Sequence, residues 1–177
     1  MTLPQLHLAV VSYPSRLERV FEETVLHLGR SVGPDFALER CQDPDDVVYL
    51  ARLWKNRGKA IVRLDLYGHG DGGRFKLGDR LLFASDGTGY PLARRLGPKL
   101  AGDAEVRLLG CDTAGASFLT RLSGKTLLAD LQRILGRRRR VLGTLGPLGP
   151  RDLGPRGPSA AAEARLRGAR RPPLVRL

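Results

Sequence analysis

Short apolar runs alternate with segments of helical periodicity along most of this chain, and that alternation constrains the fold more than any other feature. The runs are rich in Val, Leu and Ile and have the length of buried strands. They cover residues 6–11, 36–41, 60–66, 104–109 and 141–144. Strands that alternate with helices are typical of a parallel sheet covered on both faces. The sequence therefore predicts an α/β fold.

The helical segments have recognisable ends. Ser15 and Glu18 fit a capping box, in which each side chain accepts a hydrogen bond from an amide of the helix start. Asp43 stands at a second helix start, directly before a proline that suits the first turn. A third helix is predicted over residues 125–135, where Gly136 ends it.

Turn residues mark two further segments. Two alternating runs, 74–77 and 80–83, flank a Gly-Asp pair and predict a β-hairpin. Four Gly-Pro pairs fall in residues 146–159, which we expect to be an irregular loop. A short helix capped by Ser159 is expected to follow it.

The positive charge is concentrated near the C-terminus. The chain has a net charge of +12, and residues 133–177 hold twelve arginines against two acidic residues. Such a segment could contact nucleic acid or an acidic partner. However, arginine outnumbers lysine 25 to 5, which suggests a coding bias, and a solvated tail is the simpler interpretation. We expect one domain over residues 1–150 and a basic Gly/Pro/Arg-rich tail over residues 151–177.

Composition also bears on compartment and cofactors. Cys41 and Cys111 are the only cysteines, and no secretory signal or apolar stretch of about 18 residues is visible. We therefore expect a cytoplasmic protein without disulfides or a membrane span. The histidines show no ligand spacing, so no metal is expected. Residues 123–126 resemble the end of a phosphate-binding loop, but Leu119 stands where that motif needs glycine, and no cofactor is predicted.

Two of the apolar runs end on residues that can do chemistry. The run 61–66 leads to His69 and Gly70, and the run 106–109 leads to Cys111. Carboxyl ends of neighbouring parallel strands meet at the edge where ligands of open α/β sheets bind. An imidazole can take the proton of a thiol and return it to a leaving amine. The amides of Gly70 and Cys111 could then stabilise the oxyanion.

Each of these residues also has a simpler interpretation. Cys111 could be a buried thiol at a strand end, and His69 could be an ordinary turn residue. Their shared position after a strand, each with flanking glycine, favours the pair. Cys41 has no glycine-rich turn beside it and is predicted to be structural, and no role is predicted for His7 or His27.

These two motifs, Tyr-Gly-His-Gly at 67–70 and Gly-Cys-Asp-Thr-Ala at 110–114, resemble the His and Cys boxes of caspase-like cysteine peptidases. That family includes caspases, metacaspases and bacterial CHAT proteases, and the bacterial members are the most similar. The resemblance covers roughly residues 6–150. It implies a caspase-like three-layer α/β/α sandwich, with His69 as acid/base, Cys111 as nucleophile, and the amides of Gly70 and Cys111 as the oxyanion hole.

The resemblance leaves substrate preference open. Metacaspases carry an acidic residue two positions before the cysteine, where this chain has Leu109. Asp86 and Asp112 are candidate pocket acids, and Thr144 begins the loop where substrate backbone would pair.

The function implied is a cysteine endopeptidase that acts on protein substrates, activated in trans by a partner in a bacterial defence or signalling cascade. Two alternatives stay open. One is a non-catalytic caspase-like module that binds a partner. The other is a nucleic-acid-binding protein that uses the C-terminal tail, although few aromatic residues lie between its arginines and nucleic acid is not favoured.

Overall fold

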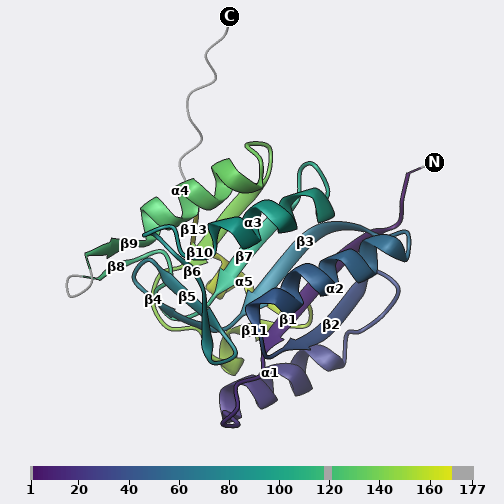
Figure 1. The fold of residues 1–177 in the computed structure, drawn as a ribbon. Helices are drawn as coiled ribbons and strands as arrows, with labels where there is room; N and C mark the ends of the chain where they lie inside the picture. Colours follow the sequence, from purple (N-terminus) through teal and green to yellow (C-terminus); the bar gives the residue numbers. More distant parts are fainter. Residues whose placement is uncertain (1, 118–120, 169–177) are drawn as a thin grey trace, which may run out of the picture.

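A computed structural model describes residues 2–117 and 121–168, which form an α/β structure around a six-stranded sheet (Figure 1). The strand order is β13-β10-β7-β3-β1-β2. β1, β2, β3, β7 and β10 run parallel, and β13 pairs antiparallel with β10. The strands are β1 (Gln5–Ser12), β2 (Phe36–Cys41), β3 (Ala60–Tyr67), β7 (Glu105–Leu109), β10 (Arg140–Thr144) and β13 (Leu166–Gly168). The expectation of a mostly parallel central sheet is confirmed.

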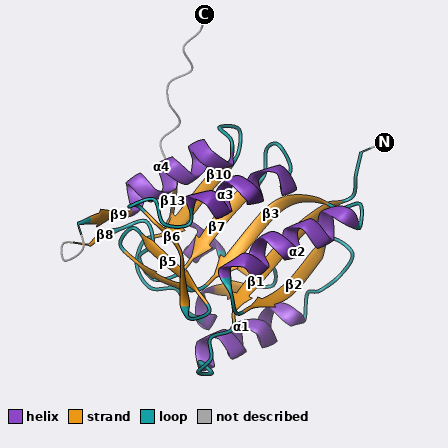
Figure 2. Ribbon diagram, in the orientation of Figure 1, coloured by secondary structure: helices purple, strands orange, loops and turns teal. Residues whose placement is uncertain are grey.

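Smaller elements surround this sheet (Figure 2). The additional strands are β4 (His69–Asp71), β5 (Arg74–Leu77), β6 (Arg80–Ala84), β8 (Ala116–Ser117), β9 (Leu122–Ser123), β11 (Leu153–Gly154) and β12 (Gly157–Pro158). The α-helices of the described residues are α1 (Arg19–Gly29), α2 (Pro44–Asn56), α3 (Tyr90–Leu96), α4 (Gly124–Leu135) and α5 (Ala160–Glu163). Two 3-10 turns, η1 (Gly97–Lys99) and η2 (Pro150–Asp152), complete the set.

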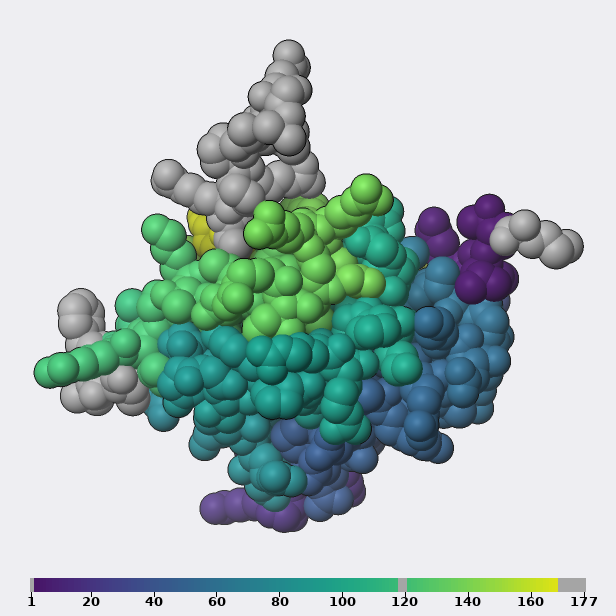
Figure 3. All heavy atoms as spheres, turned by 45° about the horizontal axis from the view of Figure 1, so that its top comes forward, coloured from purple at the N-terminus to yellow at the C-terminus, as the bar shows by residue number. Residues whose placement is uncertain are grey.

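The two faces of the sheet are covered differently. Helices α2, α3 and α4 lie side by side over one face and seal a large apolar core (Figures 1 and 3). The other face packs against α1 and against the chain between Leu148 and Leu166. Side chains alternate between these layers along each strand, as the pleat requires: Leu8 and Val10 join the first core, and Ala9 and Val11 join the second.

The helix ends confirm one prediction and correct another. Asp43 accepts a hydrogen bond from the Asp45 amide and begins α2 in a capping box, as expected. The capping box predicted from Ser15 and Glu18 is wrong. Helix α1 begins only at Arg19, and Glu18 occupies the N-cap position without a side-chain cap. Its carboxylate contacts His69 instead.

The predicted hairpin is confirmed as β5 and β6, which pair antiparallel. Strand β4 extends it to a three-stranded sheet that the sequence pattern did not indicate. The turn at Gly78 has a φ of 61°, and a Cβ there would strike the carbonyl of Gln42. Only glycine meets both conditions at this turn.

A buried charge cluster joins the C-terminal segment to the sheet. Asp65 of β3 and Arg107 of β7 are both buried, and the Arg107 Nε donates to Asp65 Oδ1 at 2.6 Å. His7 of β1 contacts the other oxygen of Asp65 at 2.8 Å. Arg107 also pairs with Glu163 of α5 at 2.9 Å. Buried charges are retained only when paired in this way, so the cluster fixes the C-terminal segment on this face.

Residues 151–168 of the expected tail therefore lie on the sheet, and residues 169–177 are outside the described part of the chain. The region 146–159 contains only η2 and the two-residue strands β11 and β12. Ser159 caps α5, as expected. Among the described residues, no helix is both long and apolar enough to span a bilayer.

Candidate active site

The parallel pairing of β3 and β7 sets the relative position of His69 and Cys111. Tyr67 lies opposite Leu109 in the register, and the Gly68 amide donates to the Leu109 carbonyl at 3.2 Å. His69 and Cys111 each follow two residues after this pair. Both therefore leave the sheet at the same carboxyl edge, as the sequence predicts for this pair of strands.

The glycines beside them allow the two turns to touch. A Cβ on Gly70 would lie 2.5 Å from the Cys111 carbonyl oxygen and 3.1 Å from its amide nitrogen. A Cβ on Gly110 would lie 2.6 Å from the Gly70 nitrogen and 3.0 Å from the His69 carbonyl carbon. A side chain at either position would push the turns apart, so glycine is what brings the two backbones together.

The Cys111 turn is held by the strand next to it. The Asp112 amide donates to the Gly146 carbonyl at 3.0 Å, and the Ala114 amide donates to the Thr144 carbonyl at 2.9 Å. Asp112 has a φ of 50°, a conformation that Asp tolerates better than most residues. These bonds direct the Cys111 side chain away from the core, and the residue is exposed.

Thr144 and Asp112, both predicted to bind substrate, make internal contacts. The buried Thr144 hydroxyl donates to the Gly110 carbonyl, directly before the cysteine. The Asp112 carboxylate accepts from the Gly146 amide at 3.2 Å. Both side chains therefore shape the Cys111 turn in this structure.

Asp86 lies elsewhere. It is exposed in the turn after β6 and accepts a hydrogen bond from the Thr88 amide at 2.9 Å. That backbone hydrogen bond lowers the pKa of the Asp86 carboxyl below its ordinary value. Within the described residues it forms no hydrogen bond or ion pair with His69 or Cys111.

His69 is held from the side of α1. Its imidazole Nε2 lies 3.0 Å from Oε1 of Glu18, and the ring packs edge-on against Phe21 at a centroid distance of 5.1 Å. The histidine side chain is 45% exposed and Glu18 is 37% exposed, so both reach solvent. Across residues 2–117 and 121–168, no hydrogen bond joins the imidazole to the Cys111 thiol.

An oxyanion site needs free amides at this edge. The Cys111 N–H makes no hydrogen bond within the described part of the chain, and its nitrogen lies close to the Gly70 turn. Amides in this state can donate to a developing negative charge without first breaking another bond. The Cys111 thiol, the Cys111 amide and the turn that carries His69 therefore lie at one edge of the sheet.

Cys41 differs from Cys111 in its exposure and in its hydrogen bonding. It ends β2, is buried, and its thiol donates to the Asp43 carbonyl at 2.9 Å. Burial raises the pKa of the Cys41 thiol far above its ordinary value, and the nearby carboxylates of Asp46 and Asp43 add to the shift. A thiol in that state is inert as a nucleophile.

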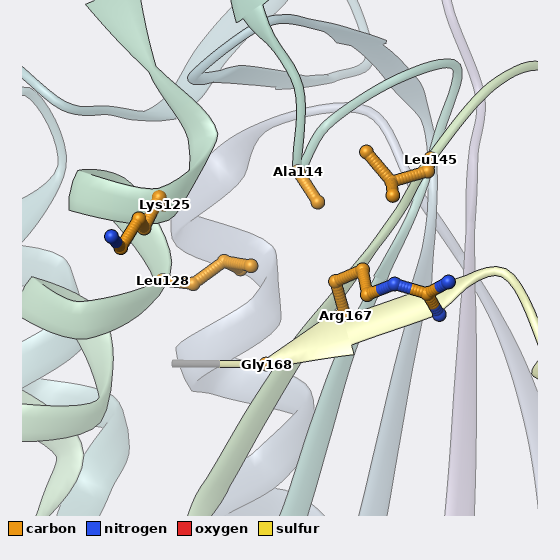
Figure 4. A pocket seen from close by; sticks show the side chains of 6 residues that line it. All are labelled: Ala114, Lys125, Leu128, Leu145, Arg167 and Gly168. Carbon is orange, nitrogen blue, oxygen red and sulfur yellow. The ribbon is translucent and has the colours of Figure 1, made fainter. Parts of the chain in front are cut away.

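A shallow pocket adjoins the Cys111 turn on the α4 side (Figure 4). Its volume is about 260 Å³, and its lining residues are Ala114, Lys125, Leu128, Leu145, Arg167 and Gly168. The guanidinium group of Arg167 donates to the carbonyls of Ala164 and Leu166. Ala114 and Leu145 come from the two loops that also hold Cys111, so the pocket is continuous with this edge.

The sequence pattern missed Glu18 as a site residue. Ser15 and Glu18 have capping-box spacing, and nothing in that spacing indicates a contact with His69, 51 residues away. No group of three or more His, Cys, Asp or Glu side chains that could hold a metal ion occurs among residues 2–117 and 121–168.

Comparisons of this chain with protein-family models, with curated proteins and with solved structures found no significant match.

Proposed function

We propose that the protein is a cysteine endopeptidase with a caspase-like α/β/α architecture, in which Cys111 is the nucleophile and His69 the acid/base. The observation that carries the proposal is the backbone contact between the two glycine-flanked turns at the carboxyl edge of β3 and β7. Cys111 in one of these turns is exposed, the His69 side chain in the other is 45% exposed, and the Cys111 amide makes no hydrogen bond in the described residues.

The chemistry follows from these groups. The imidazole of His69 takes the proton of the Cys111 thiol, and the sulfur attacks the scissile carbonyl carbon. The Gly70 and Cys111 amides donate to the resulting oxyanion. When the C–N bond breaks, the imidazolium gives its proton to the leaving amine and a thioester remains. Water, deprotonated by the same imidazole, then hydrolyses the thioester and regenerates the thiol.

The absence of a direct hydrogen bond from the imidazole to the thiol suits an enzyme at rest. Catalytic hydrogen bonds are often long before substrate binds and tighten in the complex. Both side chains reach solvent, so a rotation of either can change the distance between the imidazole and the thiol. We propose that a bound protein substrate, or an inhibitor that resembles it, supplies that rearrangement, and that an activating partner in the cytoplasm accelerates it.

The test is covalent labelling followed by intact-mass analysis. The native protein is treated with a mixed set of peptide fluoromethyl ketones, alongside Cys111→Ala, His69→Ala and Cys41→Ser. We expect one adduct on the native protein and on Cys41→Ser, because the buried Cys41 takes no part. Cys111→Ala should remain unmodified. His69→Ala should react at least about 10²-fold more slowly, the usual contribution of general acid–base catalysis.

Labelling of Cys111 that does not depend on His69 would overturn the proposal. An unlabelled native protein would also contradict it and would favour the non-catalytic partner-binding module. Circular dichroism of each variant establishes that the fold is intact.

A further inference from the structure

Glu18 occupies a helix N-cap position without capping the helix. Its carbonyl accepts the first amides of α1, from Phe21 at 3.0 Å and Glu22 at 3.3 Å, but its carboxylate makes no cap hydrogen bond. An acidic residue at a helix start ordinarily turns toward those amides. Here the carboxylate turns away from the helix and reaches Nε2 of His69 at 3.0 Å.

The segment that carries Glu18 is held in place by two hydrogen bonds shortly before Glu18. The Tyr13 amide donates to the Cys41 carbonyl at 2.8 Å, and the Ser15 amide donates to Oδ2 of Asp79 in the β5–β6 turn at 2.9 Å. Hydrogen bonds to Ser15 lower the pKa of the Asp79 carboxyl below its ordinary value, so it stays a charged acceptor. Asp79 therefore anchors the segment that presents Glu18 to the site.

The imidazole is held on two sides by this one segment. Glu18 contacts Nε2, and the ring of Phe21 meets the imidazole edge-on, with 75° between the planes. A carboxylate is only an acceptor, so Nε2 must carry the hydrogen of the bond. The neutral ring then has its lone pair on Nδ1, since the two nitrogens share one hydrogen.

We propose that Glu18 is a positioning residue for His69, which selects the Nε2–H tautomer and leaves Nδ1 free to take the Cys111 proton. This inference rests on the proposed function, because it assigns Nδ1 as the proton acceptor. When the proton moves from Sγ to Nδ1, the imidazolium formed stands directly beside the Glu18 carboxylate, which stabilises it. In triads of nucleophile, imidazole and carboxylate, the carboxylate plays this same part.

Three substitutions separate positioning from a merely structural contact. Glu18→Ala removes the acceptor, Glu18→Gln keeps an acceptor oxygen without the charge, and Glu18→Asp keeps the charge on a shorter stem. Glu22→Ala is the matched control, because Glu22 lies one turn further on α1 and pairs with Arg40 at 3.0 Å, away from His69.

Two measurements are made on each variant. The first is ¹⁵N NMR of the imidazole, which reports the tautomer of His69 without requiring any activity. The second is the rate at which a peptide fluoromethyl ketone modifies Cys111. We expect native protein and Glu22→Ala to show the Nε2–H tautomer and equal labelling rates. Glu18→Ala should lose the tautomer preference and react at least about tenfold more slowly. Glu18→Gln should keep the tautomer and fall between them, and Glu18→Asp should recover part of the rate.

The outcomes distinguish this inference from the proposed function. If native protein is labelled but Glu18→Ala keeps both tautomer and rate, Glu18 does not position His69 and the peptidase proposal stands. If native protein is not labelled at all, the peptidase proposal fails, and this inference fails with it whatever the NMR shows. A loss of rate in Glu18→Ala with an unchanged tautomer would also overturn the inference, because the effect would not pass through the imidazole.

Discussion

Two histidines of this protein contact a carboxylate, and their surroundings differ sharply. On one face of the sheet, His7 Nε2 lies 2.8 Å from Oδ2 of Asp65. The Asp65 side chain is fully buried and also pairs with Arg107. His69 and Glu18 lie at the carboxyl edge at 3.0 Å, where both side chains reach solvent. The same pair of groups therefore occurs once in the interior and once at the edge.

The two regions differ in how many of their polar groups are paired. In the interior every charge is committed: the cluster joins β1, β3 and β7 to Glu163 of α5. At the edge one nitrogen of the imidazole, the Cys111 thiol and the Cys111 amide remain without a hydrogen bond in the described residues. The paired groups of the interior stabilise the fold, and the unpaired groups at the edge are those that the proposed function uses.

The largest expected effect comes from breaking the interior cluster. Arg107→Met leaves Asp65 buried and charged without its arginine partner, and we expect the free energy of unfolding to fall by about 3–5 kcal/mol. Urea denaturation measures it. The control is Arg95→Ala, which removes an exposed ion pair with Asp45 and should cost less than about 1 kcal/mol. Equal losses of unfolding free energy in Arg107→Met and Arg95→Ala would show that the burial of an ion pair does not set its contribution to stability.

A pH dependence should distinguish the same cluster. Burial acts to raise the pKa of Asp65, but hydrogen bonds from His7 and Arg107 outweigh it and hold the pKa below its ordinary value. A carboxyl with a lowered folded-state pKa stabilises the fold above its unfolded pKa, about 3.9, and loses that contribution as the pH falls through the folded value. Asp65→Asn should therefore be less stable than the native protein at pH 7, and the gap should narrow below about pH 4. A gap that does not change in acid would contradict this assignment.

At the edge, the arrangement of the His69 and Cys111 turns depends on the close approach of their backbones rather than on paired charges. Gly70→Ala would place a methyl group 2.5 Å from the Cys111 carbonyl oxygen, and we expect a loss of about 1–3 kcal/mol in stability together with slower labelling of Cys111. Gly102→Ala is the matched control, because no atom lies within 4 Å of its added Cβ. Thermal unfolding and the labelling rate are measured on both. Similar behaviour of the two variants would remove the argument that glycine joins the turns.

The smallest expected effect comes from two threonines near Cys111. Thr113 lies within the Cys111 turn, and Thr144 lies at the end of β10. The Thr144 hydroxyl donates to the Gly110 carbonyl, whereas the buried Thr113 hydroxyl has no partner within the described residues. Thr144→Val should therefore cost about 1 kcal/mol or somewhat more, while Thr113→Val should be neutral or slightly stabilising. Urea denaturation of the two variants in parallel gives the sign of each, and a matching loss in both would show that Thr113 has a partner in solution.

Some features of the edge could be predicted and others could not. The run before His69 and the run before Cys111 both read as buried strands, and parallel pairing then requires them to end together. Glu18 could not be found in this way. Its spacing from Ser15 fits a local capping box, but the Ser15 amide bonds Asp79 and the Glu18 carboxylate bonds His69. A local sequence pattern does not indicate these hydrogen bonds, because Asp79 and His69 are distant in the sequence from Ser15 and Glu18.

The position of the C-terminal segment also depends on residues that are distant in the sequence. Its Gly-Pro pairs indicate irregular backbone, and the region 146–159 has little regular structure. Nothing in that composition indicates that it would cover a sheet face. Two contacts hold the segment on that face. Glu163 pairs with Arg107, and Gly157 packs so closely against Arg107 that a Cβ on it would lie 2.7 Å from the Arg107 Nη2.

The sequence by itself determined the mostly parallel sheet, the helices α2 and α4, the β5–β6 hairpin and the position of His69 and Cys111 at strand ends. Each follows from hydrophobic period, caps and turn residues, which act over a few neighbouring positions. Only the tertiary structure decided the partner of His69, the burial of Asp65 with Arg107, and the layer formed by residues 148–166. Those depend on contacts between segments far apart in the chain, where packing and the requirement to pair buried charges outweigh local preference.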